Sequence, residues 1–367
     1  MLEIGHLAAS TPGCISLGQG TPYYQPDSAI FEKFQKLLQQ NTMNEYAPDP
    51  GISQLRSKLV DKLRIDNSIK ATPDEITVTN GANQAFVNIL LTLADPGDKI
   101  GLISPYYFNH YMACQIGNIN VEQIPLNDDY RISHERVEAA INKGIKALVL
   151  INPGNPTGMV HSRDELHLIA DLIENTNVTL IADETYEYFT YQGSKHIPAA
   201  SLSRLKDQTV SIGSFSKTYG IPGWRLGYYH AKQEVVDQAM KIQDTTTICA
   251  PAPAQFLGLI LLEERERLVP EFTSLMENNH NVAKDLMTEI PWLNPEPASG
   301  SYYLFPRQIT GLNTNQLTKK LISEYGVALV PGLGFGQDFE DHLRISFANV
   351  QEEFLKEAFS RLKKLNA

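Results

Sequence analysis

The chain has 367 residues, of which 42% are hydrophobic and 20% are charged, so it is long enough for one large domain or two and too apolar to be mainly disordered. Its formal net charge of −11 argues against a dominant nucleic-acid or anionic-membrane surface. No apolar run reaches the ~18–20 residues of a membrane span, no leader is visible at the N-terminus and the three cysteines lie far apart. We therefore expect a cytoplasmic protein with reduced thiols, no nucleic-acid partner and no membrane association.

Helices and short apolar runs alternate along most of the chain. Helical periodicity covers Ser28–Gln40, with Ile30, Phe34, Leu37 and Leu38 on one face, and returns over Ser162–Asn175. Six apolar runs, separated by helix-length intervals, are rich in β-branched residues: Ile76–Thr79, Lys99–Ser104, Lys146–Ile151, Val178–Ala182, Thr209–Gly213 and Leu226–Tyr229. Such runs predict strands buried on both faces of a mostly parallel sheet. The sequence thus predicts a large α/β domain over residues 41–274.

The pattern changes in the C-terminal part. A long helix is predicted over Val269–Ile290, followed by short strands near Ser301–Phe305 and His342–Phe347 and by helices over Asn313–Tyr325 and Gln351–Leu365. This order predicts a smaller α+β domain over residues 275–367. Residues 1–40 belong to that domain as an N-terminal arm or wrap between subunits, and composition does not decide between the two.

Five unusual polar segments follow predicted strands. They are NGANQ at 80–84, SPYYFN at 104–109, NPGNPTG at 152–158, ADETY at 182–186 and SFSKTYGIPGWRLG at 214–227. Ligands of open parallel sheets bind outside the carboxyl ends of the strands, so the chemistry is expected here. The NPGNPTG loop is no phosphate-binding P-loop, because no GK[ST] follows it.

Two of these segments carry candidate catalytic groups. Lys217 has two serine hydroxyls beside it and Arg225 eight residues on, so these groups could hold a phosphate while the amine attacks a carbonyl; alternatively, Lys217 is a solvated surface amine. Asp183 ends a predicted strand three residues before Tyr186. It is either a helix N-cap or a carboxylate that faces a cationic ring nitrogen.

Together with LRISF at 343–347, these segments resemble the class I/II aminotransferases, which are pyridoxal 5′-phosphate (PLP) enzymes of the aspartate-aminotransferase fold, fold type I. The resemblance runs from Gly18 to Arg344 with the motifs in the family's order. GANQAFVN, PYYFNHYMA, TYEYF and SFSKTYG most resemble methionine/aromatic aminotransferases of plants and cyanobacteria. The resemblance implies a large PLP-binding domain with a mostly parallel sheet and a smaller α+β domain.

The resemblance also implies roles for the residues around the cofactor ring. Lys217 matches the Schiff-base lysine that later moves a proton, and Asp183 matches the carboxylate that keeps the pyridine nitrogen protonated. Tyr186 and Asn155 match donors to the phenolic oxygen. Tyr107 matches the aromatic residue stacked on the ring, although Tyr106 could exchange roles with it.

Further matches concern the phosphate and the substrate. Gly81, Ala82 and Asn83 would bind the phosphate at a helix N-terminus, helped by Ser214, Ser216, Arg225 and Tyr46 of the partner subunit. The last match implies a homodimer with shared active sites. Arg344 would fork onto the substrate α-carboxylate, with Gly20 and Asn155 beside it.

The motifs leave the reaction and the substrate open. A C–S lyase or a cyclising synthase of the same fold is an alternative, and a non-enzymatic PLP-binding regulator would need a DNA-binding module for which we see no room before Gly18. We predict an L-amino acid donor and a 2-oxo acid acceptor, with aromatic donors or methionine favoured. The segment Ile242 to Glu264 and the position of Asn83 lack the cation that aspartate-specific relatives use, and Tyr23 and Tyr24 are expected at the entrance. An aspartate-type enzyme stays open, because Arg307 could reach the pocket.

Two further expectations concern metal binding and cis peptide bonds. His161 and His167 are spaced for no metal site, so we predict no metal. The family carries cis peptides in two motifs, which predicts cis bonds at Ser104-Pro105 and Asn155-Pro156.

Overall fold

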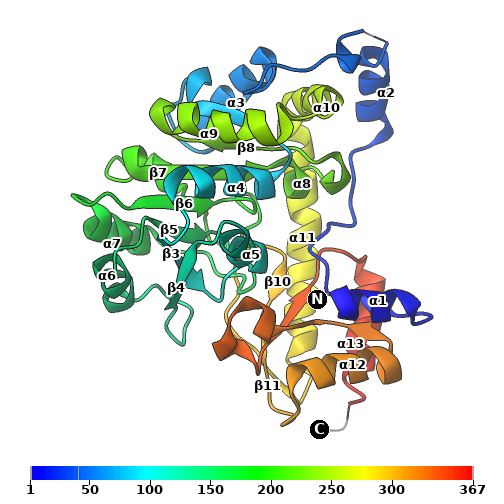
Figure 1. Cartoon of the computed structure of the whole chain (residues 1–367). Coiled ribbons are helices and arrows are strands. Elements are labelled where there is room, and N and C mark those ends of the chain that lie inside the picture. Colours follow the sequence, from blue (N-terminus) through cyan, green and yellow to red (C-terminus); the bar gives the residue numbers. More distant parts are fainter. Residues whose placement is uncertain (1, 40, 366–367) are drawn as a thin grey trace.

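The computed structural model describes residues 2–39 and 41–365 and places seven strands in one sheet (Figure 1). Their order is β2-β8-β7-β6-β5-β3-β4, and β8 alone runs against the common direction. The strands are β2 (Ile76–Thr79), β3 (Lys99–Ser104), β4 (Asn120–Pro125), β5 (Ala147–Ile151), β6 (Thr179–Asp183), β7 (Thr209–Ser214) and β8 (Gly227–His230). The predicted mostly parallel sheet is confirmed, and all six predicted strands match within one residue at each end.

The edge strand β4 is missing from the prediction. Its sequence contains Asn120, Glu122 and Gln123, and its residues are mostly half-buried. An edge strand with a solvent-facing side does not need the apolar run by which a central strand is found.

Helices cover both faces of the sheet. Within β5, Ala147 and Val149 point into the core under one face, and Leu148 and Leu150 into the core under the other, as the two-residue period of a strand requires. The first face is covered by α4 (Ala82–Leu93), α5 (Phe108–Ile116) and α9 (Gln233–Thr247), and the second by α6 (His134–Asn142) and α7 (Arg163–Ile173). The predicted helix at 162–175 is confirmed as α7, with Ser162 as its N-cap.

A third core joins the sheet to the C-terminal part. It contains residues of α2 (Ser28–Leu37), α3 (Ser53–Asp66), α10 (Ala252–Glu263) and α11 (Arg265–Met287), and α11 runs past the sheet as the long helix of Figure 1. The prediction for α2 was wrong at its end. The helix stops at Leu37, Leu38 is 47% exposed instead of buried, and Gln40 lies outside the described residues.

The C-terminal part contains small sheets. A three-stranded antiparallel sheet is formed by β10 (Tyr303–Leu304), β14 (Leu343–Ser346) and β13 (Val330–Pro331), while β9 (Leu293–Asn294) pairs with β11 (Arg307–Gln308). The N-terminal segment joins this part, because β1 (Ile15–Ser16) pairs with β12 (Val327–Ala328). Around these strands lie α1 (Leu2–Ser10), α12 (Thr314–Tyr325) and α13 (Glu352–Leu362).

On this basis we propose a large domain over residues 41–274 and a small domain formed by residues 1–40 and 275–367. Within the N-terminal arm, α2 crosses back and packs on α10 beside the sheet. The arm therefore bridges the two proposed domains.

The loops after β2, β3, β5, β6 and β7 meet at the carboxyl edge of the sheet. The two predicted cis bonds, Ser104-Pro105 and Asn155-Pro156, are confirmed, and Asn152-Pro153 is cis as well. Among the described residues, every helix is too short or too polar to cross a membrane.

Candidate active site

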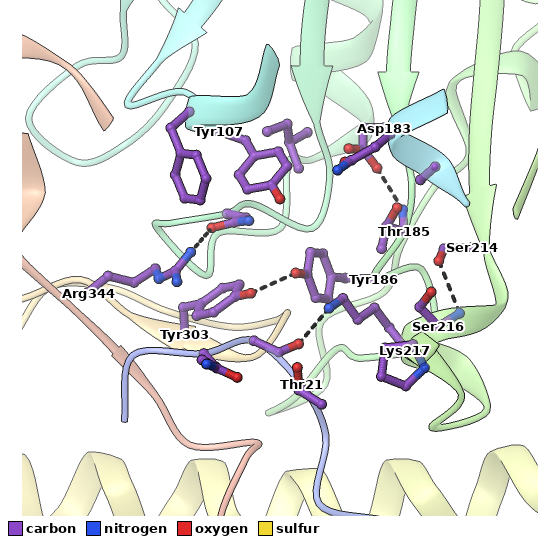
Figure 2. Close-up of a pocket in the computed structure, with 18 of the residues that line it drawn as sticks. Thr21, Tyr107, Asp183, Thr185, Tyr186, Ser214, Ser216, Lys217, Tyr303 and Arg344 are labelled. Atoms are coloured by element: carbon purple, nitrogen blue, oxygen red, sulfur yellow. Dashed lines mark hydrogen bonds between the residues drawn. The ribbon is translucent and has the colours of Figure 1, made fainter. Parts of the chain in front are cut away.

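A cavity of about 340 Å³ lies at this edge of the sheet, between the strand ends, the N-terminal segment and β14 (Figure 2). It brings together most of the predicted site residues, although they come from distant parts of the sequence. Those that line it are Gly20, Ala82, Asn83, Tyr107, Asn155, Asp183, Tyr186, Ser214, Ser216, Lys217, Arg225 and Arg344.

Lys217 projects into this cavity from α8 (Phe215–Thr218), the one-turn helix that follows β7. Its Nζ donates a hydrogen bond of 2.6 Å to the main-chain oxygen of Gly20. Burial, followed by the charges of Arg344 and Arg225, lowers the pKa of the Lys217 amine to about 8, against the opposing effect of Asp183. The lowered pKa increases the share of neutral amine at pH 7, and the neutral amine is the form that can attack a carbonyl.

Asp183 ends β6 and is held by its neighbours. Its Oδ2 lies 3.3 Å from Nε2 of His110, and its Oδ1 accepts a hydrogen bond of 3.1 Å from the main-chain N–H of Thr185. Burial raises the pKa of Asp183, but the hydrogen bond and charge of His110 and the bonds from Thr185 outweigh it, and the pKa lies below its ordinary value. Asp183 is therefore a carboxylate that remains ionised although it is buried.

Arg344 is a buried cation from β14. Its Nη1 donates to Oδ1 of Asn155 at 3.0 Å and its Nη2 to the main-chain oxygen of Gly18 at 2.7 Å. Its guanidinium also lies 4.3 Å from the ring centre of Tyr303. Its Nε has no hydrogen-bond partner, and no carboxylate of the described residues lies within 4 Å. A buried guanidinium without an acidic partner is a ready site for an anion.

Three tyrosines, Tyr107, Tyr186 and Tyr303, line the cavity. The hydroxyls of Tyr186 and Tyr303 lie 2.8 Å apart, as Figure 2 shows. Burial raises the pKa of Tyr107 to about 12 and that of Tyr186 well above its ordinary value, so both phenols stay protonated. Tyr107 lines the cavity, whereas Tyr106 stacks on Tyr111 with ring centres 5.2 Å apart.

The start of α4 forms a cradle beside Lys217. Gly81 is its N-cap with φ of 80°, and a Cβ at Gly81 would lie 2.6 Å from Nη2 of Arg225. The first N–H groups of α4 lack intrahelical partners and carry the positive end of the helix dipole. With the hydroxyls of Ser214 at the end of β7 and of Ser216 in α8, this cradle can bind a phosphate.

Four residues that were expected at or near the site lie outside this cavity. Tyr46 is 80% exposed and does not line the cavity of its own chain, so its action in a partner's site stays a prediction. The expectation that Tyr23 and Tyr24 form the entrance was wrong. Neither lines the cavity, and Tyr24 is buried with its ring stacked on Phe272. Arg307 also stays outside the cavity, half-exposed and paired with Asp341 at 3.2 Å.

Sequence analysis missed His110, Thr185 and Tyr303. Thr185 and His110 lie within or beside motifs that were singled out, but a motif does not tell which side chains turn toward Asp183. Tyr303 was placed on a predicted strand, and its contact with Tyr186 joins positions 117 residues apart.

Comparison with known proteins identifies the family. A model of the family described as aminotransferase class I and II matches residues 12–362. The aromatic aminotransferase ISS1 of Arabidopsis thaliana is 35% identical over 99% of this chain and 92% of its own length. An aspartate aminotransferase of Pyrococcus abyssi is 30% identical over 98% of this chain and 93% of its own. The structure of the Thermus thermophilus aspartate aminotransferase with maleate superposes with a TM-score of 0.91 at 27% identity, over 99% of this chain and 95% of the other.

The chain belongs to the class I and II aminotransferase family. Its fold is the α/β fold of aspartate aminotransferases, fold type I, and it is an enzyme that transfers amino groups. The family uses pyridoxal 5′-phosphate.

Proposed function

We propose that this aminotransferase binds pyridoxal 5′-phosphate through Lys217 and moves the amino group of an aromatic L-amino acid or methionine to a 2-oxo acid. The observation that carries the first part is a cavity that holds a half-buried amine, a buried carboxylate and a helix N-terminus together. The second part rests on the cations of the cavity and on the apolar space beside it.

The residues present fit the cofactor. The cradle of Gly81, Ala82, Asn83, Ser214, Ser216 and Arg225 offers main-chain N–H groups, hydroxyls and a cation, which suit a phosphate dianion. The close approach of Arg225 to Gly81 leaves no room for a side chain there, so the phosphate could meet the bare main chain. Asp183 lies across the cavity as an ionised acceptor for a ring N–H group.

When bound, pyridoxal 5′-phosphate supplies an electron sink for the electrons left on the substrate Cα. Lys217 would hold the cofactor covalently through its neutral amine, and once the substrate amine has taken its place, the freed amine would move a proton at Cα. Asp183 would hold a proton on the ring nitrogen. Tyr186 and the Nδ2 group of Asn155 would donate to the phenolic oxygen, since the Oδ1 of Asn155 already accepts from Arg344.

Arg344 would orient the substrate. Two of its N–H groups already point at acceptors, and a bound α-carboxylate would supply the acidic partner that this buried cation lacks. Gly20 would offer its main chain to the same carboxylate. A fixed carboxylate would place the Cα–H bond near the Lys217 amine, which favours loss of the Cα proton over loss of the carboxylate. Transamination and elimination both begin with this proton, so a product assay must separate them.

The small number of cations lining the cavity favours a substrate with an apolar side chain. Lys217, Arg225 and Arg344 are the charged donors among its described lining residues, and each has a role already. A side-chain carboxylate would need a fourth cation, because an unpaired buried charge is costly.

A second cavity beside the first supports the same conclusion. It has a volume of about 640 Å³, shares Gly18, Gln19 and Phe108 with the first, and is otherwise mainly apolar. Its further lining includes Ile4 and Ala8 of α1, Cys14 before β1, Ala328 of β12, Leu329, and Val330 of β13. An aromatic ring or a thioether fits such a space.

The proposal also includes a homodimer with shared sites. Tyr46 is compatible with it, because its side chain is 80% exposed and lies outside the cavity of its own chain, where a partner subunit could reach it. The partner's Tyr46 would complete the phosphate cradle.

The test is a comparison of kcat/KM for phenylalanine, methionine and aspartate with one 2-oxo acid. We expect phenylalanine or methionine to exceed aspartate by about tenfold or more, the effect of one unpaired charge. A preference for aspartate contradicts the substrate proposal. Release of pyruvate or ammonia from a single amino acid, without a new amino acid, contradicts the transfer reaction for that substrate.

A charge variant makes the test sharper. Ala9 is an exposed residue of α1 that lines the second cavity, and Ala9→Arg should raise kcat/KM for aspartate relative to phenylalanine. Ser10→Arg places the same charge one position away, outside the lining, and is the matched control. An equal change in both variants would show that the second cavity does not receive the substrate side chain.

A further inference from the structure

Two tyrosine hydroxyls lie within hydrogen-bond distance of the main-chain oxygen of Lys217. That of Tyr24 donates to it at 2.5 Å and that of Tyr302 at 3.0 Å, and the two hydroxyls lie 2.5 Å from each other. Tyr24 lies 193 residues before Lys217 in the sequence, and Tyr302 lies 85 residues after it. Neither residue lines the cavity, so their hydroxyls act on the far side of the lysine.

The local structure explains why this oxygen needs donors. The helix α8 has four residues, so the last carbonyls of this single turn lack the partners that a longer helix would supply. A buried carbonyl without a donor is costly. The chain after Lys217 also closes on Tyr24, because a Cβ at Gly220 (φ of 65°) would lie 2.4 Å from the main-chain oxygen of Tyr24.

Both ends of Lys217 are therefore held by the N-terminal segment. Its Nζ donates to Gly20, and its main-chain oxygen accepts from Tyr24 four residues later. The second donor, Tyr302, has its ring edge-on to Tyr186 with ring centres 5.2 Å apart. The same small cluster thus contacts the lysine and one proposed donor to the cofactor.

We propose that Tyr24 and Tyr302 are positioning residues for Lys217, which hold its main chain so that its amine stays in line with the reacting atoms. This inference rests on the proposed function of Lys217. Neither tyrosine touches the cavity, so each acts through the lysine. Their hydroxyls couple the position of the lysine to the N-terminal segment and to β10.

The number of hydroxyl protons predicts how the effects of removing the Tyr24 and Tyr302 hydroxyls combine. Each hydroxyl has one proton and the carbonyl oxygen has two lone pairs, so the three contacts hold two hydrogen bonds at a time: two to the carbonyl, or one to the carbonyl and one between the hydroxyls. After the loss of one hydroxyl, the other can still donate to the carbonyl. After the loss of both, the carbonyl is buried without a donor. We expect single variants to lower kcat about twofold to threefold and the double variant to lower it about tenfold or more, beyond the product of the single effects.

The experiment uses the cofactor-loaded enzyme and the variants Tyr24→Phe, Tyr302→Phe and the double variant. Tyr191→Phe is the matched control, because Tyr191 is equally buried and its hydroxyl donates to the main-chain oxygen of Ser301 at 2.7 Å. We measure kcat and KM, the thermal unfolding temperature, and the pH midpoint of the visible absorbance. Only the absorbance and the kcat-to-KM split report on the position of the lysine.

A positioning role predicts that the double variant moves the absorbance midpoint by about half a pH unit or more and lowers kcat with KM within about threefold. Tyr191→Phe should lower the unfolding temperature without moving the midpoint. If the double variant does not fold, Tyr24→Phe decides: a kcat lowered about twofold to threefold together with a shifted midpoint supports the positioning role, and no change in either overturns it.

An unchanged midpoint and kcat, with only a lower unfolding temperature, would overturn the inference and leave the tyrosines with a structural role. A wild-type protein that develops no visible absorbance with pyridoxal 5′-phosphate would instead contradict the proposed function.

Discussion

Replacing Arg344 by lysine tests how the substrate is held. The guanidinium presents two parallel N–H groups to a carboxylate, and a lysine ammonium presents a single point charge. Hydrogen bonds to charged groups contribute about 1.5–3 kcal/mol each, so the loss of one should cost about 2 kcal/mol, or about 30-fold in kcat/KM. Asn155 and Gly18 also lose the donors that Arg344 gives them, which adds to the loss.

Steady-state kinetics at several amino-acid concentrations separate the effect on KM from the effect on kcat. The carboxylate is bound in both the ground state and the transition state, so KM should rise while kcat changes by about threefold or less. Arg307→Lys is the matched control, because Arg307 is half-exposed outside the cavity. A kcat/KM for Arg344→Lys within about threefold of wild type, or an equal loss in Arg307→Lys, would contradict the role of Arg344 in holding the carboxylate.

Two other predictions concern Lys217 and the dimer. The neutral amine is the form that reacts, so the rate at which cofactor-free enzyme captures pyridoxal 5′-phosphate should rise with pH and level off above about 8, near the lowered pKa of Lys217; a rate still rising at pH 10 would contradict this. Mixtures of Lys217→Ala and Tyr46→Ala should regain activity after subunit exchange, because one site of each heterodimer is complete. No gain over the separate variants, with exchange confirmed by mass spectrometry, argues against shared sites.

The sheet could be predicted because its central strands are buried on both faces. Apolar runs such as residues 147–151 are recognisable in the sequence, whereas the edge strand β4 is polar and was missed. The end of α2 was wrong because helical periodicity continues through Leu38 although the chain has already left the core.

The site could be predicted where a short motif carries several functional groups. Lys217 and Arg225 stand in one segment, and the cavity contains both. The contacts of His110 with Asp183 and of Tyr303 with Tyr186 join residues 73 or more positions apart, and no local pattern encodes them. Tyr24 shows the same limit: we expected it at the entrance, but its ring packs on Phe272 and its hydroxyl lies behind Lys217.

Covalent binding of the cofactor by Lys217 is the step on which the proposed function rests. Treating the loaded enzyme with borohydride, digesting it and mapping the modified peptide by mass spectrometry tests this most directly. We predict that the visible absorbance disappears, that the added mass lies on Lys217, and that Lys217→Ala shows neither the absorbance nor turnover while its unfolding temperature stays close to that of the cofactor-free wild type. A modification on another lysine, or turnover by Lys217→Ala, would contradict the account.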